Sequence, residues 1–204
     1  PIIEGYGLTE ASPAVCFNPP YGTQKEGSIG LPIPYMECKI VDDNDMELPA
    51  GEIGELVVRG ENVMLGYFKQ EEETRKALLN GWLHTGDLAK KDEDGYIYIV
   101  DRKKDMVLVA GLNVYPREVE EVIYQYSKVK EAAVIGVKDK LRGEYVKAFI
   151  VLKEGEECTS AELHHYLRDR LAAYKLPRII DFVPSLPKNN TGKIMKRILK
   201  EQQN

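Results

Sequence analysis

The chain has 204 residues, of which 43% are hydrophobic and 30% charged, values typical of a globular protein with one or two domains and a buried core. Three scattered cysteines exclude a disulfide framework and a CxxC zinc or redox site, and they favour a reducing, cytoplasmic setting. The longest apolar run, Met106 to Leu112, is far below the roughly 20 residues of a membrane helix, so we predict no transmembrane segment.

Charge is distributed unevenly along the chain. Residues 1–103 carry 10 Lys and Arg against 19 Asp and Glu, whereas residues 104–204 carry 18 against 14. The positive second half suits an approach to phosphates, but it has no basic stripe with interleaved aromatic residues, so we do not predict nucleic-acid binding. The chain begins at Pro1, directly before strand-like Ile2-Ile3, and we therefore expect a piece of a longer protein.

The segment Glu4-Gly5-Tyr6-Gly7-Leu8-Thr9-Glu10 follows the strand expected at Ile2-Ile3. Its glycines allow backbone amides to approach a phosphate, the tyrosine ring can stack on a base, and Thr-Glu can hold phosphate and Mg²⁺. The spacing is not GxGxxG, because Glu10 stands at the third glycine position. A nucleotide contact and a purely structural turn therefore both fit these residues.

Strands, turns and one helix are predicted in the rest of the first half. Alternating segments predict strands at Met36 to Val41 and Gly54 to Gly60. Between them, Asp42 to Asp45 lacks the glycine of a calcium loop, which favours a hairpin turn. Residues 71–80, acidic first and basic later, predict a surface helix. Asp94-Gly95 predicts a hairpin that pairs residues 87–91 with 96–100.

Five consecutive charged residues, Asp101 to Asp105, indicate an exposed linker between two domains, although a charged hairpin connection is an alternative. Pro116 suits the first position of a helix, and strands are predicted at residues 132–137, 145–152 and 178–183. Thr159 to Glu162 form a capping box for a second helix that ends before Pro177. The apolar faces of the two helices are predicted to carry Val119, Val122, Ile123 and Tyr126, and Leu163, Leu167 and Leu171, respectively.

The chain ends with Pro187-Lys188-Asn189-Asn190-Thr191-Gly192-Lys193 and a short basic helix with Ile194, Ile198 and Leu199 on one side. By itself, this pattern indicates a mobile loop before a solvated helix. The loop also fails the GxxxxGK phosphate-loop pattern, because Pro187 stands where that pattern requires glycine.

Together, these motifs resemble the adenylate-forming (AMP-binding) superfamily of acyl-CoA synthetases, most closely bacterial long-chain fatty acid–CoA ligases. The resemblance covers the whole chain and implies an α+β fragment. Residues 1–103 would be the β-rich end of a large N-terminal domain, and residues 104–204 a small mobile C-terminal α+β domain. The family's upstream phosphate loop and most of its acyl pocket are absent, so we expect the piece to be inactive alone. The motifs are Glu4 to Glu10, Gly54-Glu55-Leu56, Gly81 to Asp87, Asp101 to Asp105, Gly111 to Glu120 and Pro187 to Lys193.

The resemblance implies a two-step reaction, in which ATP activates a fatty acid as acyl-AMP and CoA then accepts the acyl group. Lys193 would be catalytic in the first step, Glu10 would hold Mg²⁺, and Lys104 would be the hinge of the small domain. ATP, Mg²⁺ and CoA are thus the expected cofactors and co-substrates. The implied ATP or AMP contacts are Tyr6, Gly7, Thr9, Asp87, Ile99, Arg102 and Lys193, and the implied CoA-channel residues are Ala110, Gly111 and Leu112.

Other interpretations stay open at this point. An enzyme of the same fold could load acyl groups on a carrier protein or emit light from an adenylate, and a non-catalytic module could bind nucleotide or a partner. Position 110 is Ala where relatives often have Ser or Gly, so a backbone contact is expected there. His84, His164 and His165 are interpreted as structural or surface residues. Peripheral membrane contact, oligomeric state and acyl chain length are left open.

Overall fold

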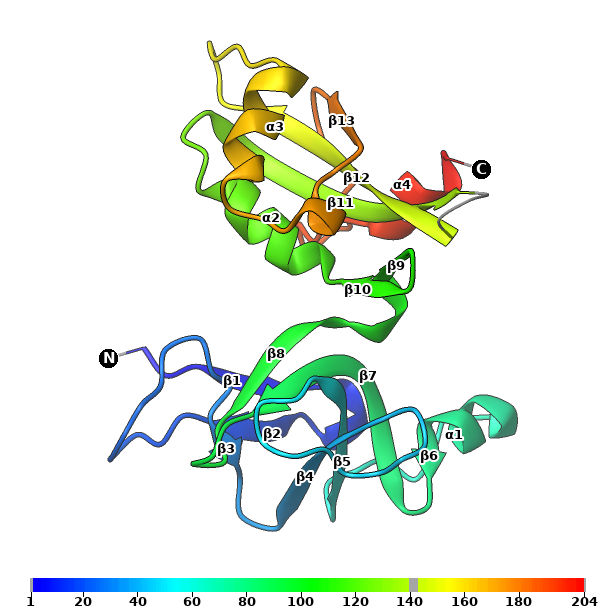
Figure 1. The fold of residues 1–204 in the computed structure, drawn as a ribbon. Helices are drawn as coiled ribbons and strands as arrows, with labels where there is room; N and C mark the ends of the chain where they lie inside the picture. Colours follow the sequence, from blue (N-terminus) through cyan, green and yellow to red (C-terminus); the bar gives the residue numbers. More distant parts are fainter. Residues whose placement is uncertain (1, 140–142, 204) are drawn as a thin grey trace. The chain divides into compact units, whose positions relative to one another are not determined.

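The computed structural model describes residues 2–139 and 143–203. It divides into two compact units, Pro1–Lys103 and Lys104–Asn204 (Figure 1). The first unit is built from two antiparallel sheets with one short helix, and the second combines a sheet with helices on both of its faces. The predicted α+β class is therefore confirmed.

The first unit contains a three-stranded and a five-stranded sheet. The smaller sheet has the order β1 (Gly5–Gly7), β2 (Ala14–Phe17) and β3 (Leu31–Pro32). The larger has β4 (Met36–Val41), β5 (Gly54–Gly60), β7 (Trp82–Lys91) and β6 (Leu78–Leu79), with β8 (Ile97–Arg102) paired to β7. Buried residues from both sheets form one core, including Val15, Ile40, Leu56 and Ile97.

The first strand is Gly5–Gly7, so the strand expected at Ile2-Ile3 is wrong. Both isoleucines are exposed, at 90% and 42%. The glycines are needed because β1 lies very close to its neighbours. A Cβ atom on Gly5 would lie 2.2 Å from the Phe17 ring, and one on Gly7 would lie 2.1 Å from the Pro13 carbonyl oxygen. Apolar character alone therefore does not locate this strand.

Strands β4 and β5 have the predicted bounds, and Asp42 forms the predicted hairpin turn between them. Its Oδ1 accepts hydrogen bonds from the Asn44 amide at 2.8 Å and the Met46 amide at 2.9 Å. Because the carboxylate replaces a backbone acceptor within the turn, the acidic cluster has a local structural role.

Helix α1 (Glu71–Ala77) is shorter than the predicted helix over residues 71–80. Leu78 and Leu79 instead form β6 and pair with Leu83 and Trp82 of β7. The cause is the Asn80-Gly81 turn, in which both residues have positive φ, 51° and 83°. Asn-Gly is the strongest short hairpin signal, and in this segment it overrides the helical composition.

The hairpin around Asp94-Gly95 is confirmed, but its strands are longer than predicted. Strand β7 already begins at Trp82, and β8 continues to Arg102. Asp101 and Arg102, predicted to lie in an exposed linker, are therefore strand residues, and Asp101 is buried. The pairing of β8 with β7 holds them in the sheet, and only Lys103–Asp105 forms a separate 3-10 turn, η2.

The sheet of the second unit has a hydrophobic core on each of its faces. Successive strand residues alternate between these cores, as the two-residue strand period requires. Its order is β10 (Leu112–Val114), β9 (Val107–Val109), β12 (Gly143–Leu152) and β11 (Val129–Asp139), and β13 (Ile179–Phe182) is parallel to β12. One face packs against α2 (Pro116–Tyr124) and α3 (Ser160–Arg168), and the other against α4 (Lys196–Glu201).

The starts of α2 and α3 agree with the sequence, but other helix bounds do not. Helix α2 ends at Tyr124, before the predicted face residue Tyr126, and α4 begins at Lys196, after the predicted face residue Ile194. Pro116 occupies the first turn of α2, and Thr159 Oγ1 accepts the Glu162 amide hydrogen at 3.1 Å. Helix α3 ends at Arg168, so its predicted continuation toward Pro177 is wrong. A tighter turn closes the helix through the Arg170 amide to the Leu167 carbonyl at 3.0 Å, followed by a separate 3-10 helix, η3 (Ala173–Lys175).

Leu163→Ala is expected to destabilise the second unit by about 2–5 kcal/mol, because Leu163 is fully buried between α3 and the sheet. Urea unfolding followed by far-ultraviolet circular dichroism would measure this loss. Leu108→Ala is the control, since this side chain is 46% exposed and its loss should cost under about 1 kcal/mol. Equal destabilisation by the two substitutions would contradict the core assignment.

Candidate functional site

Three predicted site residues meet in the first unit, each from a different strand. The Tyr6 hydroxyl of β1 donates a hydrogen bond to Asp87 Oδ2 of β7 at 2.5 Å. Arg102 Nε of β8 lies 3.2 Å from Asp87 Oδ1. Asp87 is 8% exposed, so a nearly buried carboxylate has a phenol on one oxygen and a guanidinium on the other.

A local irregularity of β7 sets the position of Asp87. Glu55 of β5 is paired with Leu88 and Val57 with His84, so the segment from Thr85 to Asp87 stands opposite Leu56 alone. Such a bulge bends a strand and redirects a side chain, and bulges are frequent beside active sites. Gly86 supplies the left-handed conformation, with φ of 71°.

Thr85 fastens this bulge from within. Its hydroxyl donates to the Leu56 carbonyl at 2.7 Å and accepts the Asp87 amide hydrogen at 3.1 Å. The backbone of Asp87 is thus fixed to β5 through one side chain. Sequence reasoning did not assign Thr85 a role, although its place in Thr-Gly-Asp was a usable signal.

The environment of Tyr6 keeps its hydroxyl protonated. Burial raises the pKa of Tyr6 well above its usual value of 10, and the hydrogen bond to Asp87 raises it further. Tyr6 therefore remains a hydrogen-bond donor at every pH at which the protein is expected to work. Its ring packs beside the core of the first unit, as does Ile99.

The other predicted residues of the first unit lie just beyond β1. Gly7 ends the strand, while Thr9 and Glu10 begin a 3-10 turn, η1 (Thr9–Ala11). Thr9 is exposed, and Glu10 Oε1 accepts a hydrogen bond from the Tyr67 hydroxyl at 2.9 Å. Tyr67 is a further residue that the sequence did not reveal, because it is 57 positions from Glu10.

Lys193, in the second unit, belongs to a closed turn. Lys188 and Ile194 form an antiparallel bridge, and Asn189 Oδ1 accepts hydrogen bonds from the Thr191 amide, the Thr191 hydroxyl and the Lys193 amide at 2.8–3.0 Å. Residues 188–194 thus form an internally bonded loop rather than an unstructured connection.

The Lys193 side chain differs from its neighbours in its contacts. It is exposed and, among residues 2–139 and 143–203, its ammonium group forms no ion pair or hydrogen bond. Nearby lysines are held by carboxylates, in the pairs Lys188–Glu131 at 2.5 Å, Lys196–Glu120 at 2.7 Å and Lys200–Asp105 at 3.4 Å. Lys193 therefore has a fixed backbone and an available charge.

Lys104 and the predicted CoA-channel residues lie near the start of the second unit. Lys104 is exposed within η2. Ala110 and Gly111 form the two-residue turn between β9 and β10, with φ of 50° and 85°. Ala110 thus adopts a left-handed conformation that favours glycine, and Leu112, which follows the turn, is 49% exposed.

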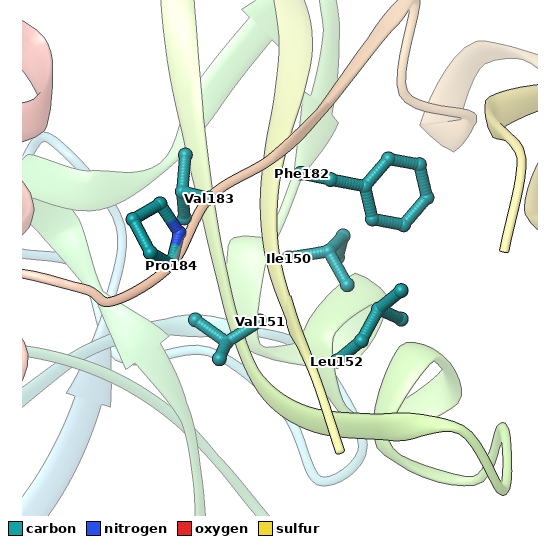
Figure 2. Close-up of a pocket in the computed structure, with 6 residues that line it drawn as sticks. All are labelled: Ile150, Val151, Leu152, Phe182, Val183 and Pro184. Carbon is teal, nitrogen blue, oxygen red and sulfur yellow. The ribbon is translucent and has the colours of Figure 1, made fainter. Parts of the chain in front are cut away.

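A separate pocket of about 280 Å³ lies at the ends of β12 and β13 (Figure 2). It is lined by Ile150, Val151, Leu152, Phe182, Val183 and Pro184. Ile150, Leu152 and Phe182 belong to one core of the sheet, whereas Val151 and Val183 belong to the other. It contains none of the predicted site residues and no charged side chain, so it is an irregularity at the edge of the two cores.

Two family models match the chain. Residues 1–68 match the AMP-binding enzyme model, and residues 118–193 match the AMP-binding enzyme C-terminal domain model. Long-chain-fatty-acid–CoA ligases from Escherichia coli O6:H1 and Bacillus subtilis strain 168 are 49% and 47% identical over 201 and 203 residues. These alignments cover 98% and 99% of the chain but only 36% of each relative.

Solved structures of related enzymes also match the chain over nearly its whole length. ATP-bound MatB from Rhodopseudomonas palustris matches with a TM-score of 0.93 and 38% identity, over 98% of this chain and 40% of that structure. The Bacillus subtilis o-succinylbenzoate CoA synthetase in complex with its acyl-adenylate intermediate matches with a TM-score of 0.90 and 37% identity, over 98% and 41%. The ordered motifs, the fold of both units and these matches identify the chain as a member of the adenylate-forming, AMP-binding enzyme family.

Proposed function

We propose that the protein containing this chain is a fatty acid–CoA ligase that works through an acyl-adenylate. In the first step, a fatty acid carboxylate attacks the α-phosphate of ATP and releases pyrophosphate. In the second step, the CoA thiol attacks the acyl carbon and releases AMP, which gives the thioester. The meeting of Tyr6, Asp87 and Arg102 in a member of this family carries the proposal.

Asp87 suits the ribose hydroxyls of the nucleotide. An ionised carboxylate offers about four acceptor sites, and Tyr6 and Arg102 occupy two of them. The remaining sites can accept two hydroxyl hydrogens, and the Arg102 guanidinium compensates the negative charge. The adenine ring would then lie against the Tyr6 ring and beside Ile99. The phosphates would extend toward Gly7 and Thr9, which follow Tyr6 in the sequence.

Glu10 fits the role of a Mg²⁺ ligand. Mg²⁺ prefers carboxylate oxygens, and the bond from Tyr67 to Oε1 orients the carboxyl group while leaving Oε2 free of any bond to the described residues. When bound there, Mg²⁺ would neutralise phosphate charge. The protein's own contribution is to hold Glu10 one residue after Thr9, the proposed α-phosphate contact.

Lys193 supplies the positive charge for adenylation in this proposal. The carboxylate and the α-phosphate are both anionic, so a fixed cation lowers the barrier to their reaction. A lysine suits this task because its compact charge is on a long, flexible stem. Lys104 would be the hinge that changes the position of the second domain between the two steps, and the Ala110-Gly111 turn would approach the pantetheine of CoA.

A thioester assay with full-length protein tests the proposed function. ATP, CoA and a panel of fatty acids should give acyl-CoA, AMP and pyrophosphate in equal amounts. Acyl transfer to a carrier protein but not to CoA would favour the carrier-loading alternative. Nucleotide binding without any acyl-adenylate would favour a non-catalytic module.

Asp87→Asn should raise the KM for ATP by about 10–100-fold, because hydrogen bonds to a charged group contribute about 1.5–3 kcal/mol. Steady-state kinetics at varied ATP concentration would measure the change. Asp94→Asn is the matched control, since Asp94 is an exposed turn residue paired with Lys25. An unchanged KM in Asp87→Asn would exclude the ribose contact.

A further inference from the structure

Glu55 is a nearly buried carboxylate that no part of the proposed chemistry uses. It lies on β5 and is 8% exposed. Its Oε1 accepts the Gly86 amide hydrogen at 3.1 Å, and its Oε2 lies 3.1 Å from Lys103 Nζ and 3.3 Å from His84 Nδ1. The two oxygens therefore contact different parts of the first unit.

The first oxygen holds the bulge that directs Asp87. Gly86 is the residue immediately before Asp87, and its left-handed backbone has no ladder partner on β5. The bulge is thus fastened at two points, by Thr85 to the Leu56 carbonyl and by Glu55 to the Gly86 amide. The second bond has an ionised acceptor, so it depends on the charge of Glu55 as well as on its position.

The second oxygen connects this bulge to the end of the first unit. Lys103 is the last residue of that unit, and its ammonium group also lies 2.9 Å from Asp43. Burial by itself would raise the pKa of Glu55, but Lys103, His84 and the Gly86 amide outweigh it and lower the pKa below its usual value. Glu55 is therefore ionised at neutral pH, and its charge is compensated within the same cluster. His84 has the structural role that the sequence indicated, here as a partner of Glu55.

We propose that Glu55 is a positioning residue for nucleotide binding, which holds the Thr85–Asp87 bulge through Gly86 and ties it to Lys103 at the end of the first unit. The inference rests on the proposed function, because Asp87 is taken as the ribose contact. Glu55 itself does not touch the nucleotide. It acts by fixing the Gly86 backbone amide, which sets the position of Asp87. Loss of Glu55 would therefore displace the Asp87 carboxylate without changing it chemically.

Full-length Glu55→Ala should raise the KM for ATP about tenfold, with kcat changed less than about threefold, because misplacing a binding group by a fraction of an ångström is costly. Glu55→Gln retains a carbonyl oxygen that can accept the Gly86 hydrogen but loses the charge that pairs with Lys103, so its KM should rise by less than that of Glu55→Ala. Glu37→Ala is the matched control. Glu37 belongs to the same sheet and pairs with Arg59 at 2.7 Å, but it has no contact with the bulge.

Amide hydrogen exchange gives a readout that does not depend on activity. Exchange of residues 85–87 should accelerate most in Glu55→Ala, less in Glu55→Gln and not in Glu37→Ala. An unchanged KM for ATP in Glu55→Ala, an equal KM increase in Glu55→Gln, or unchanged exchange at residues 85–87 would overturn the proposal. If the unmodified protein forms no acyl-adenylate, the proposed function fails, whereas the exchange result still decides whether Glu55 holds the bulge.

Discussion

Lys193→Ala in the full-length protein is expected to lower ATP–pyrophosphate exchange by about 10²–10³-fold, the usual effect of removing one group that stabilises transition-state charge. Conversion of supplied acyl-adenylate and CoA to thioester should stay within about threefold of the unmodified rate, because that step creates no bond to phosphorus. Both rates would be measured separately, with radiolabelled pyrophosphate and with a thiol-consumption assay.

The loop offers a matched control for this experiment. Lys188→Ala removes a lysine from the same turn, but Lys188 is already paired with Glu131 and is not assigned to the chemistry. It should therefore leave both half-reactions nearly unchanged. Equal loss of both half-reactions in Lys193→Ala would contradict a role restricted to adenylation.

Lys104→Pro should leave adenylation nearly intact but lower thioester formation at least tenfold, because proline fixes φ at the residue that would absorb the rotation of a hinge. Lys104→Ala provides the comparison, since it removes the exposed side chain and leaves the backbone free to rotate. The same two half-reaction assays would be used for both variants.

The pattern of losses distinguishes a hinge from a folding defect. A hinge predicts that Lys104→Pro affects only the second half-reaction and that Lys104→Ala affects neither strongly. If Lys104→Pro lost both half-reactions together with its thermal transition, the hinge assignment would be wrong. Thermal unfolding of both variants, followed by circular dichroism, is therefore part of the experiment.

Local patterns in the sequence predicted much of the second unit. Leu163 and Leu167 recur at helical spacing and are both fully buried, and Thr159 caps the helix that carries them. These features depend on residues within one or two helical turns of each other, so the sequence displays them directly. The length of α3 was overestimated because its end depends on a tight turn at Arg170, without glycine or proline.

In the first unit, local sequence patterns predicted less of the structure. The Asn80-Gly81 pair is a hairpin signal in the sequence, but the charge pattern of residues 71–80 predicts a helix that includes Asn80. The bulge at Thr85 to Asp87 could not be predicted, because its two extra residues are recognised only when the partner strand is known. Motif resemblance indicated Asp87 as a site residue but gave no information about what holds it.

The contacts of Glu55 could not be predicted from the sequence. Its partners Gly86 and Lys103 are 31 and 48 positions away, and their contacts arise because β5 pairs with β7 and β7 pairs with β8, the strand that Lys103 follows. Nothing in Gly54-Glu55-Leu56 distinguishes a buried organising carboxylate from an exposed strand residue. Long-range contacts of this kind have to be taken from the folded chain.

The closed turn before Lys193 has an energetic consequence for any step that uses this lysine. Ordering a flexible backbone costs about 1–2 kcal/mol per residue, and Asn189 has already met this cost for the loop by accepting three hydrogen bonds. Only the rotamers of the lysine side chain, worth about 2 kcal/mol, remain to be fixed when its charge is used. Because Asn189 orders the loop backbone when the chain folds, the entropy cost of that ordering would not be added to the activation barrier of a step that uses Lys193.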